Sequence, residues 1–329
     1  MKRIVLAGNV NVDSVKMLPQ WPERGRLVNV SRIERSVGGC VSNTGIDLKR
    51  LDPSVTVKAL AKVGTDAPGE FARTVLSSYG LDTQGLIEVP GMSTATVDCL
   101  TVEGSGERTF LFAKGAGATL DLDDVDVARL DCDIFHLGYL LLLDALDAPD
   151  DAYGTRAARL LARVQAAGIK TSIDVVSEQS DRFCRVVEPA LKYCDYVVVN
   201  EIEASLATGR PASDMRGMCE ALMAKGVRER VVIHCPEKSA ALDRTGEYVE
   251  LGSLVLPEGW IVGATGAGDA FCAGMLLSFL NGWNAMDGMR LASCAAACNL
   301  SAADSIGGAC SAEEALDLER RFERRQTCS

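Results

Sequence analysis

The segment Gly263-Ala-Thr-Gly-Ala-Gly-Asp-Ala-Phe271 places a glycine-rich turn and a carboxylate at the beginning of a predicted helix. Apolar residues recur at helical spacing after it, and Asn281-Gly282 predicts the end of that helix. Backbone N–H groups in the first turn of a helix are free, and together with the positive end of the helix dipole they favour a bound anion. The amides of Gly266, Ala267 and Gly268 are therefore a candidate phosphate site.

Asp269 directly follows these amides. A bound phosphate would repel the carboxylate of Asp269. A phosphate site beside this carboxylate therefore favours phosphoryl transfer to a hydroxyl, with Asp269 accepting the proton of that hydroxyl. The dipeptide Asp269-Ala270 stands where a Walker A motif needs Lys-Ser/Thr, which argues against a P-loop NTPase. From these residues alone a second interpretation stays open, in which the glycines allow close helix packing and the aspartate caps the helix.

The composition of the chain excludes several classes of protein. Its 329 residues are 47% hydrophobic and 24% charged, which predicts a globular protein with one large α/β core or two domains. The net charge of −11 argues against a nucleic acid partner, because such a partner requires clustered Lys and Arg. The apolar run near the N-terminus is shorter than a signal-peptide core, and later runs are far shorter than the roughly 18 residues that span a bilayer. We therefore expect a cytoplasmic protein without a membrane partner.

Twelve cysteines are scattered along the chain. None falls at C-x2-C spacing, Cys294 and Cys298 come closest at C-x3-C, and His136 and His234 are the two histidines. This spacing does not predict a zinc site. We expect the cysteines to be reduced thiols that serve as small buried side chains.

Predicted strands and helices alternate along most of the chain, beginning with a strand at 4–7. Repeated βα units of this kind predict a mostly parallel, doubly wound sheet with right-handed crossovers. After residue 134 the predicted strands are 134–137, 170–175, 196–199 and 231–234, and the predicted helices are 153–167, 201–208 and 213–225.

Residues 94–102 and 108–112 depart from this pattern, because they alternate like antiparallel strands around a turn at 103–107 and predict a hairpin. Together with residues 12–37, the hairpin could form a small antiparallel sheet that serves as a lid. An antiparallel extension of the core sheet fits the pattern equally well. Exposed edges of a lid sheet could pair between subunits, so a homodimer through the lid is an expectation.

Polar residues with binding potential follow the first strand and a later pair of glycines. Asp13 comes just past the carboxyl end of the first strand, the edge at which ligands bind in open α/β sheets. Gly38 and Gly39 allow a ligand to approach the backbone, and Asn43 offers both a donor and an acceptor. Structural roles are the alternative, since Asp13 could cap a turn and Asn43 the helix predicted at 44–51.

The order of these elements resembles the ribokinase-like (PfkB) carbohydrate kinase family, over about residues 3 to 311. The resemblance implies a three-layer, doubly wound α/β core built from residues 1–11, 38–91 and 118–329. It also implies a small antiparallel β lid built from residues 12–37 and 92–117. The elements that carry the resemblance are Asp13, Gly38-Gly39 with Asn43, the hairpin, Asn200-Glu-Ile-Glu203 and Gly266-Ala-Gly-Asp269.

The resemblance implies ATP-dependent transfer of a γ-phosphoryl group to a hydroxyl of a small sugar, with a primary hydroxyl favoured. Asp269 would be the general base, and the 266–268 amides would form the anion hole for the phosphoryl group in transit. Asn200 and Glu203 would act around Mg²⁺ and phosphate, with Glu203 holding the metal through water. The residues implied to hold the sugar are Asp13, Gly38, Gly39, Asn43 and, more loosely, Asp144.

Three segments depart from the family pattern, and one of them is Asp174-Val-Val-Ser177, where an Asp-x-Asn pattern is frequent. Gly263-Ala264 stand where Asp-Thr is common, and the lost carboxylate weakens the expectation of a bound K⁺ ion. His234–Ser239 stands where a Thr-x-Gly-x-x-Gly nucleotide segment is typical, and Pro236 cannot act as a flexible glycine. Lys238 could contact a phosphate and His234 the nucleotide, although a structural role for His234 at the end of a buried strand fits as well.

Two other functions remain open at this point. A nucleoside kinase would need an aromatic platform for the base near the lid, for which Trp21 and Phe112 are among few candidates. A non-catalytic ligand-binding relative is compatible with the altered segment at 234–239. The intact Asp269 argues against this third function.

Overall fold

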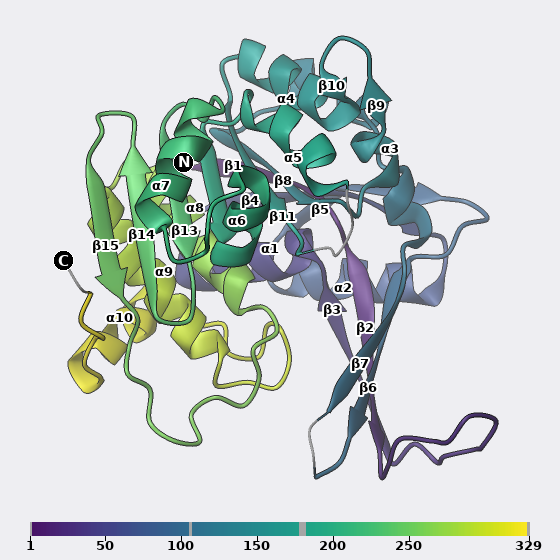
Figure 1. Ribbon diagram of the computed structural model, residues 1–329. Coiled ribbons are helices and arrows are strands. Elements are labelled where there is room, and N and C mark those ends of the chain that lie inside the picture. The colour runs from purple at the N-terminus through teal and green to yellow at the C-terminus, as the bar shows by residue number, and fades with distance from the viewer. Residues whose placement is uncertain (1, 105–106, 178–181, 328–329) are drawn as a thin grey trace.

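The structure is a computed structural model that describes residues 2–104, 107–177 and 182–327. Its core is a nine-stranded sheet with helices on both faces (Figure 1). The sheet is parallel from β5 to β13, and β14 and β15 add an antiparallel edge. In spatial order the strands are β15 (Tyr248–Gly252), β14 (Lys238–Asp243), β13 (Arg230–His234), β12 (Tyr196–Asn200), β11 (Lys170–Val175), β8 (Ile134–Leu140), β1 (Arg3–Gly8), β4 (Thr56–Gly64) and β5 (Asp82–Val89).

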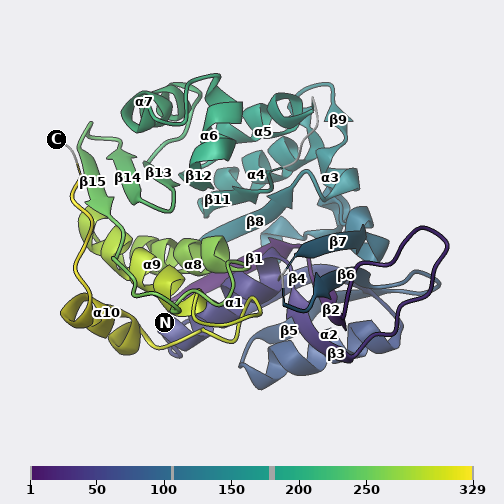
Figure 2. The same ribbon diagram turned by 60° about the horizontal axis from the view of Figure 1, so that its bottom comes forward.

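Each central strand is apolar on both sides, as expected for a parallel sheet buried between helices. In β1, Ile4 and Leu6 belong to one apolar cluster, and Val5 and Ala7 belong to the other. Helices α1, α2, α8, α9 and α10 cover the first face and α4 to α7 the second, which confirms the predicted three-layer fold (Figure 2). The helices are α1 (Cys40–Leu51), α2 (Ala67–Ser78), α3 (Asp144–Asp147), α4 (Arg156–Ala166), α5 (Phe183–Leu191), α6 (Glu201–Thr208), α7 (Met215–Ala224), α8 (Ala267–Asn281), α9 (Ala285–Asn299) and α10 (Ala312–Arg321).

A second sheet of four strands, in the order β3-β2-β6-β7, projects away from the core (Figure 1). It is therefore separate from the core sheet. Each hairpin within it is antiparallel, whereas the central pair β2–β6 is parallel. The reason is that the chain returns to the core after β3, so β2 and β6 both run outward. Its strands are β2 (Asn11–Leu18), β3 (Arg32–Gly38), β6 (Ala95–Val102) and β7 (Arg108–Ala113).

Helix α8 begins and ends where the sequence predicts. Gly266 is its N-cap, with φ 84°, and Asp269 lies in the first turn. Gly282 ends the helix in the left-handed region, with φ 65°. Between these glycines the side chains are buried nearly all around, so the helix passes through the interior of the protein.

Helix α1 begins at Cys40, four residues earlier than predicted. Gly39 has φ 88° and lets the chain turn sharply into the helix. Asn43 consequently lies inside the first turn, where its backbone N–H donates to the Gly39 carbonyl at 2.9 Å. The alternative role of Asn43 as a helix cap is therefore wrong.

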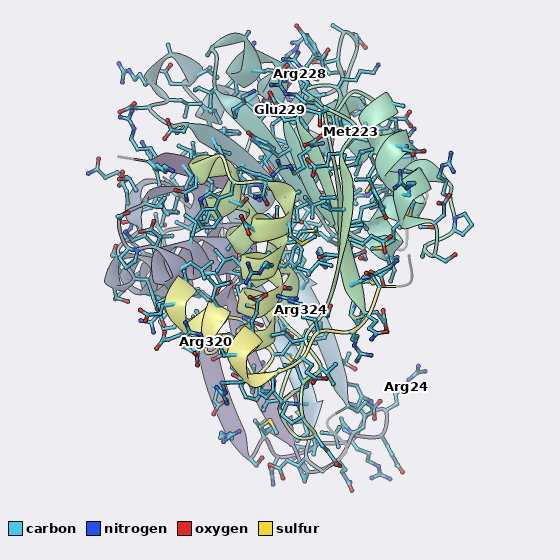
Figure 3. All side chains as sticks on the ribbon, turned by 90° about the vertical axis from the view of Figure 1, so that its left-hand side faces the viewer. Arg24, Met223, Arg228, Glu229, Arg320 and Arg324 are labelled. Carbon is cyan, nitrogen blue, oxygen red and sulfur yellow. The ribbon has the colours of Figure 1, made fainter. Side chains whose placement is uncertain are left out.

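The C-terminal helix α10 ends at Arg321. The chain then returns to the core sheet, where Arg324 donates to Glu319 and to the carbonyl of Gly252. Figure 3 shows Arg320 and Arg324 on this side of the molecule, with Arg24 far away at the outer end of the lid. No helix in the described part of the chain is both long and apolar enough to span a membrane.

Candidate active site

Asp269 is the centre of a buried hydrogen-bond cluster at the N-terminus of α8. Its side chain is 8% exposed. Oδ2 accepts a bond of 2.9 Å from Nδ2 of Asn43 on α1. Oδ1 accepts a bond of 2.5 Å from the hydroxyl of Tyr139 on β8 and a longer one, 3.4 Å, from Thr44. Burial raises the pKa of Asp269, and these three donors oppose that rise by stabilising the ionised form.

The turn before Asp269 requires glycine for steric reasons. A Cβ at Gly266 would lie 2.4 Å from the carbonyl oxygen of Ser305, and its φ of 84° disfavours other residues. Gly268 is exposed, and the nearest atom to a Cβ placed there is Cε1 of His234, at 3.8 Å. The N–H of Ala267 donates to the carbonyl oxygen of Ala264 at 3.4 Å, and the other amides of the first turn of α8 have no acceptor within the helix. The structure thus brings Gly266, Ala267 and Gly268 together with Asp269.

Gly38 and Gly39 pack tightly against the segment that connects β1 to β2. A Cβ at Gly38 would lie 2.6 Å from Oδ2 of Asp13, and one at Gly39 would lie 2.6 Å from the carbonyl oxygen of Asn9. Asp13 therefore lies directly over Gly38, and it accepts a bond of 2.5 Å from Asn11. The structure brings these three sequence-predicted sugar-binding residues together at the base of the lid.

Asn43 and Asp144, which were predicted to hold the sugar, have protein partners in the structure. Both polar atoms of the Asn43 side chain are engaged, because Nδ2 donates to Asp269 and Oδ1 accepts from Oγ of Ser305 at 2.9 Å. Asn43 therefore positions the carboxylate of Asp269. Asp144 is exposed at the start of α3 and forms an ion pair of 2.6 Å with Lys114, which follows β7. This ion pair connects the end of the lid to the core.

Burial raises the pKa of Asp13 to about 6, and the hydrogen bond from Asn11 opposes this rise. The charged form, which accepts the stronger hydrogen bonds from sugar hydroxyls, is therefore dominant only above about pH 6. We expect kcat/KM for the sugar to fall as the pH decreases through about 6. In the Asp13→Asn variant kcat/KM should be lower, and its pH profile should lack the decrease near pH 6. A decrease of the same size in both proteins, measured in steady-state pH profiles, would contradict the assignment.

Asn200 and Glu203 cap α6 reciprocally. Oδ1 of Asn200 accepts from the N–H groups of Ile202 and Glu203 at 3.0 and 2.9 Å, and Oε2 of Glu203 accepts from the N–H of Asn200 at 3.0 Å. Oε1 of Glu203 accepts from Ser177 at 2.9 Å. The side chain of Glu203 is 6% exposed, so this carboxylate is buried.

The acidic groups near Glu203 fit a hard divalent cation. Burial raises the pKa of Glu203 to about 7, an effect that the bonds from Asn200 and Ser177 oppose. The pKa of Asp174 on β11 is raised well above its usual range by burial and then by the charges of Asp269 and Glu203. Several carboxylates are thus crowded together, and carboxylate oxygens are the ligands that Mg²⁺ prefers. A cation at this edge would relieve their mutual repulsion.

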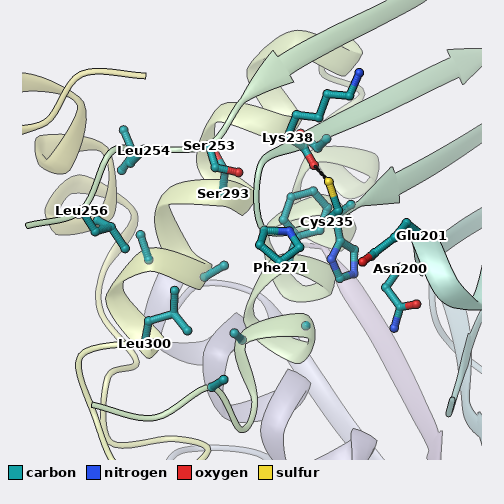
Figure 4. Close-up of a pocket in the computed structure, with 18 of the residues that line it drawn as sticks. Asn200, Glu201, Cys235, Lys238, Ser253, Leu254, Leu256, Phe271, Ser293 and Leu300 are labelled. Carbon is teal, nitrogen blue, oxygen red and sulfur yellow. Dashed lines mark hydrogen bonds between the residues drawn. The ribbon is translucent and has the colours of Figure 1, made fainter. Parts of the chain in front are cut away.

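A cavity of about 540 Å³ lies beside the N-terminus of α8 (Figure 4). Four of the five residues predicted to contact the cofactor line it, namely Asn200, His234, Lys238 and Gly268, whereas Glu203 is not part of the lining. The ring of His234 packs against that of Phe271 with centroids 4.6 Å apart, and burial lowers its pKa to about 4, so the imidazole is neutral. The rest of the lining is largely apolar and includes Leu254, Leu256, Ile261 and Leu300.

Lys238 does not extend into this cavity. Figure 4 shows its side chain running away from Asn200 and Phe271. Its Nζ forms an ion pair of 2.7 Å with Glu250 on the neighbouring strand β15. A contact between Lys238 and a phosphate would require this ion pair to break.

Sequence reasoning missed three residues that contact Asp269 or its partner Asn43. Tyr139 lies near the carboxyl end of a predicted strand, so the rule that singled out Asp13 could have found it. Thr44 directly follows Asn43. Ser305 follows α9 and contacts Asn43 across 262 residues of chain, which leaves no local signal.

The departure at Gly263 has a steric explanation. A Cβ at this position would lie 2.7 Å from the carbonyl oxygen of Ala302 and 3.1 Å from that of Ala303. These carbonyls fill the space that a carboxylate side chain at 263 would need. The observation agrees with a weakened expectation of a K⁺ ion that uses such a carboxylate.

A three-layer α/β fold with a carboxylate beside the first-turn amides of one helix is the arrangement expected of a phosphotransferase that acts on an alcohol. The chain belongs to the pfkB family of carbohydrate kinases, since the model described as "pfkB family carbohydrate kinase" matches residues 1–309. It is 28% identical to an ATP-dependent ribose-1-phosphate kinase of Halopiger xanaduensis, over 85% of this chain and 86% of that protein. It is 25% identical to a deoxyribokinase of Salmonella typhi, over 82% of each chain.

Among solved structures, the Arabidopsis thaliana ribokinase complexed with ribose and ATP superposes with a TM-score of 0.78. The sequence identity is 19%, and the match covers 97% of this chain and 99% of that chain. This likeness confirms the ribokinase fold. The family match and the curated relatives show that the protein is an enzyme, a kinase of the sugar and nucleoside class.

Proposed function

We propose that the protein transfers the γ-phosphoryl group of ATP to a hydroxyl, preferably a primary one, of a small sugar. The observation that supports this most is the position of Asp269, a buried and firmly oriented carboxylate beside the first-turn amides of α8. The names of the relatives, which include an ATP-dependent sugar-phosphate kinase and a deoxyribokinase, favour the same substrate class.

In the proposed reaction the sugar lies between the lid and Asp269. Asp13 accepts hydrogen bonds from the sugar's hydroxyls, and the glycine backbone at 38–39 lets the ring come close. Asp269 accepts the proton of the attacking hydroxyl, which is typically worth about 10²–10⁴-fold in rate. The hydroxyl of Tyr139 donates to Oδ1 of Asp269 at 2.5 Å, so the attacking hydroxyl must compete with Tyr139 for this oxygen.

ATP would lie in the cavity, with its base among the apolar side chains and its phosphates toward Gly268. The amides of 266–268 would stabilise negative charge on the γ-phosphoryl group as it transfers. Mg²⁺, held near Glu203 through water, would neutralise phosphate charge. Lys238 would contribute only if it exchanges Glu250 for a phosphate, so we assign nucleotide binding chiefly to the backbone, Asn200 and His234.

A nucleoside is the second candidate acceptor, and the lid provides a specific reason. Asp13, Val97 and Phe112 lie opposite one another across β2, β6 and β7, so their side chains share one face of the lid. Phe112 is 36% exposed and could support a base while Asp13 holds the ribose. A non-catalytic binding role is the least favoured, because Asp269 and its three donors are intact.

ATP consumption measured across free sugars, sugar phosphates and nucleosides distinguishes these functions. We expect turnover with a sugar and at least about 10-fold less with nucleosides, and an Asp269→Asn sample provides the background. Running each reaction in K⁺ and in Na⁺ tests the cation, and we expect little difference because carbonyls fill the space at Gly263. Ligand binding without turnover on any acceptor would refute the proposed catalysis.

We also propose that two copies associate through their lids. The outer strands of the lid expose large apolar side chains at Ile33, Phe110 and Leu111, each more than half exposed at 57%, 55% and 56%. Exposed strands of this kind pair readily with a second sheet. The molar mass in solution, with Leu111→Lys as the disrupting variant, tests this association.

A further inference from the structure

Four potential metal ligands from four elements meet beneath Asp269, between the core sheet and helices α1 and α8. They are Cys40 on α1, His136 on β8, Asp174 on β11 and Cys272 on α8. One ligand atom each of Cys40, His136 and Asp174 lies within 4.8 Å of the others. Sγ of Cys272 lies 4.0 Å from Nε2 of His136.

The imidazole of His136 is prepared to act as a ligand. It is fully buried, and burial lowers its pKa to about 3, so the ring is neutral. Nδ1 lies 3.1 Å from Oγ of Ser172. When the proton is on Nδ1 and donates to Ser172, the lone pair of Nε2 points toward Cys272. Histidines that bind metals typically hold their second ring nitrogen in this way.

The thiols of Cys40 and Cys272 are fully buried, whereas the carboxylate of Asp174 is less so. Cys40 is 0% exposed and Cys272 is 2% exposed. Asp174 is partly exposed, and a Cβ at Gly138 would touch both Sγ of Cys40 and Cβ of Asp174, at 2.7 and 2.9 Å. An ion could therefore enter past Asp174.

We propose that Cys40, His136, Asp174 and Cys272 bind a thiophilic divalent cation such as Zn²⁺. Two sulfurs, one nitrogen and one oxygen form a ligand set that zinc accepts and that Mg²⁺ does not. Binding would release the two thiol protons to solvent. Zinc–ligand bonds of about 2.0–2.3 Å require ligand atoms about 3.3–3.8 Å apart, so the side chains of Cys40, His136 and Asp174, now within 4.8 Å of one another, must close by up to about 1.5 Å.

Occupancy of this site would inhibit phosphoryl transfer, an effect that rests on the proposed catalytic role of Asp269. Cys272 follows Asp269 by three residues and so lies on the same side of α8. The loaded site keeps a net negative charge, because two thiolates and Asp174 outweigh the divalent cation, so its effect on the base would be geometric. Drawing Cys40 and Cys272 together would shift α1 against α8 and disturb the bond from Asn43 that orients Asp269. The rate of phosphoryl transfer would thus depend on the concentration of a thiophilic metal ion.

Metal content per chain tests the binding. The metal-free protein is equilibrated with Zn²⁺ in the presence of excess Mg²⁺, and weakly bound ions are removed by gel filtration. We expect about one zinc per chain in the wild type and at least about 10-fold weaker binding in Cys40→Ser and Cys272→Ser. The matched control is Cys219→Ser, a buried thiol of α7 on the opposite face of the sheet, which should bind like the wild type.

Two further measurements keep the test independent of how the variants fold. Co²⁺ added to the wild type should give the near-ultraviolet charge-transfer band of cobalt–thiolate bonds. Kinase activity of the zinc-loaded wild type should fall at least about 10-fold, return with a chelator, and be insensitive to zinc in Cys272→Ser. Absence of zinc and of the cobalt band, or equal zinc in wild type and Cys272→Ser, would overturn the site. Full activity at one zinc per chain would overturn the inhibition alone.

Discussion

The Asp269→Asn variant is expected to lower kcat by at least about 10²-fold while the KM values change little. An amide cannot accept the hydroxyl proton, and a general base typically contributes about 10²–10⁴-fold. Substrate contacts through Asp13 and the nucleotide cavity would remain, so the loss should appear in kcat and not in binding. Steady-state kinetics with the acceptor found in the substrate screen measure both quantities.

The structure offers a matched control for this variant. Asp47 on α1 is 2% exposed, and its Oδ2 has no hydrogen-bond partner among the described residues. Burial and then the charge of Asp269 raise its pKa, so it is a second buried carboxylate in the same region. Asp47→Asn should keep kcat within about 3-fold. Equal losses in Asp269→Asn and Asp47→Asn would show that the effect reflects packing and not catalysis.

The second large effect is expected for Gly266→Ala. The left-handed φ of 84° costs a non-glycine residue about 1–2 kcal/mol. A Cβ 2.4 Å from the carbonyl oxygen of Ser305 adds an overpacking cost of about 1–3 kcal/mol. We expect the free energy of unfolding to fall by at least about 2 kcal/mol. Because Ser305 orients Asn43, which orients Asp269, kcat should fall at least about 10-fold as well.

Gly282→Ala at the other end of α8 separates backbone strain from the local clash. Gly282 has a similar φ of 65°, but nothing lies within 4 Å of a Cβ placed there. This variant should lose about 1–2 kcal/mol and keep its kcat. Denaturant unfolding and steady-state kinetics compare the pair. If the two variants have the same stability and activity, Ser305 has no influence on the base.

Local signals were sufficient to predict α8. The glycine turn, the apolar spacing and the Asn281-Gly282 stop all lie within one segment, and the structure has the helix at Ala267–Asn281. The start of α1 could not be predicted in the same way. It depends on the positive φ of Gly39, which packs against the carbonyl oxygen of Asn9, a residue of another segment.

Two of the residues that hold Asp269 in place were not predicted from the sequence, for a related reason. Tyr139 and Ser305 contribute through contacts that join distant parts of the chain, and neither belongs to a recognisable motif. The prediction against a zinc site relied on local cysteine spacing. The candidate ligands Cys40 and Cys272 are 232 positions apart, so their proximity depends entirely on the packing of α1 against α8.

The bonds that hold Asp269 also determine when this enzyme can become active during its synthesis. Asn43 is made early, Tyr139 later, and Ser305 near the end of the chain, yet all three are connected to one carboxylate. In a nascent chain that lacks Ser305, Asn43 has lost one of the two hydrogen bonds of its side chain, so it holds Asp269 less firmly. Phosphoryl transfer, and with it any wasteful hydrolysis of ATP, should therefore begin only after almost the whole protein has left the ribosome.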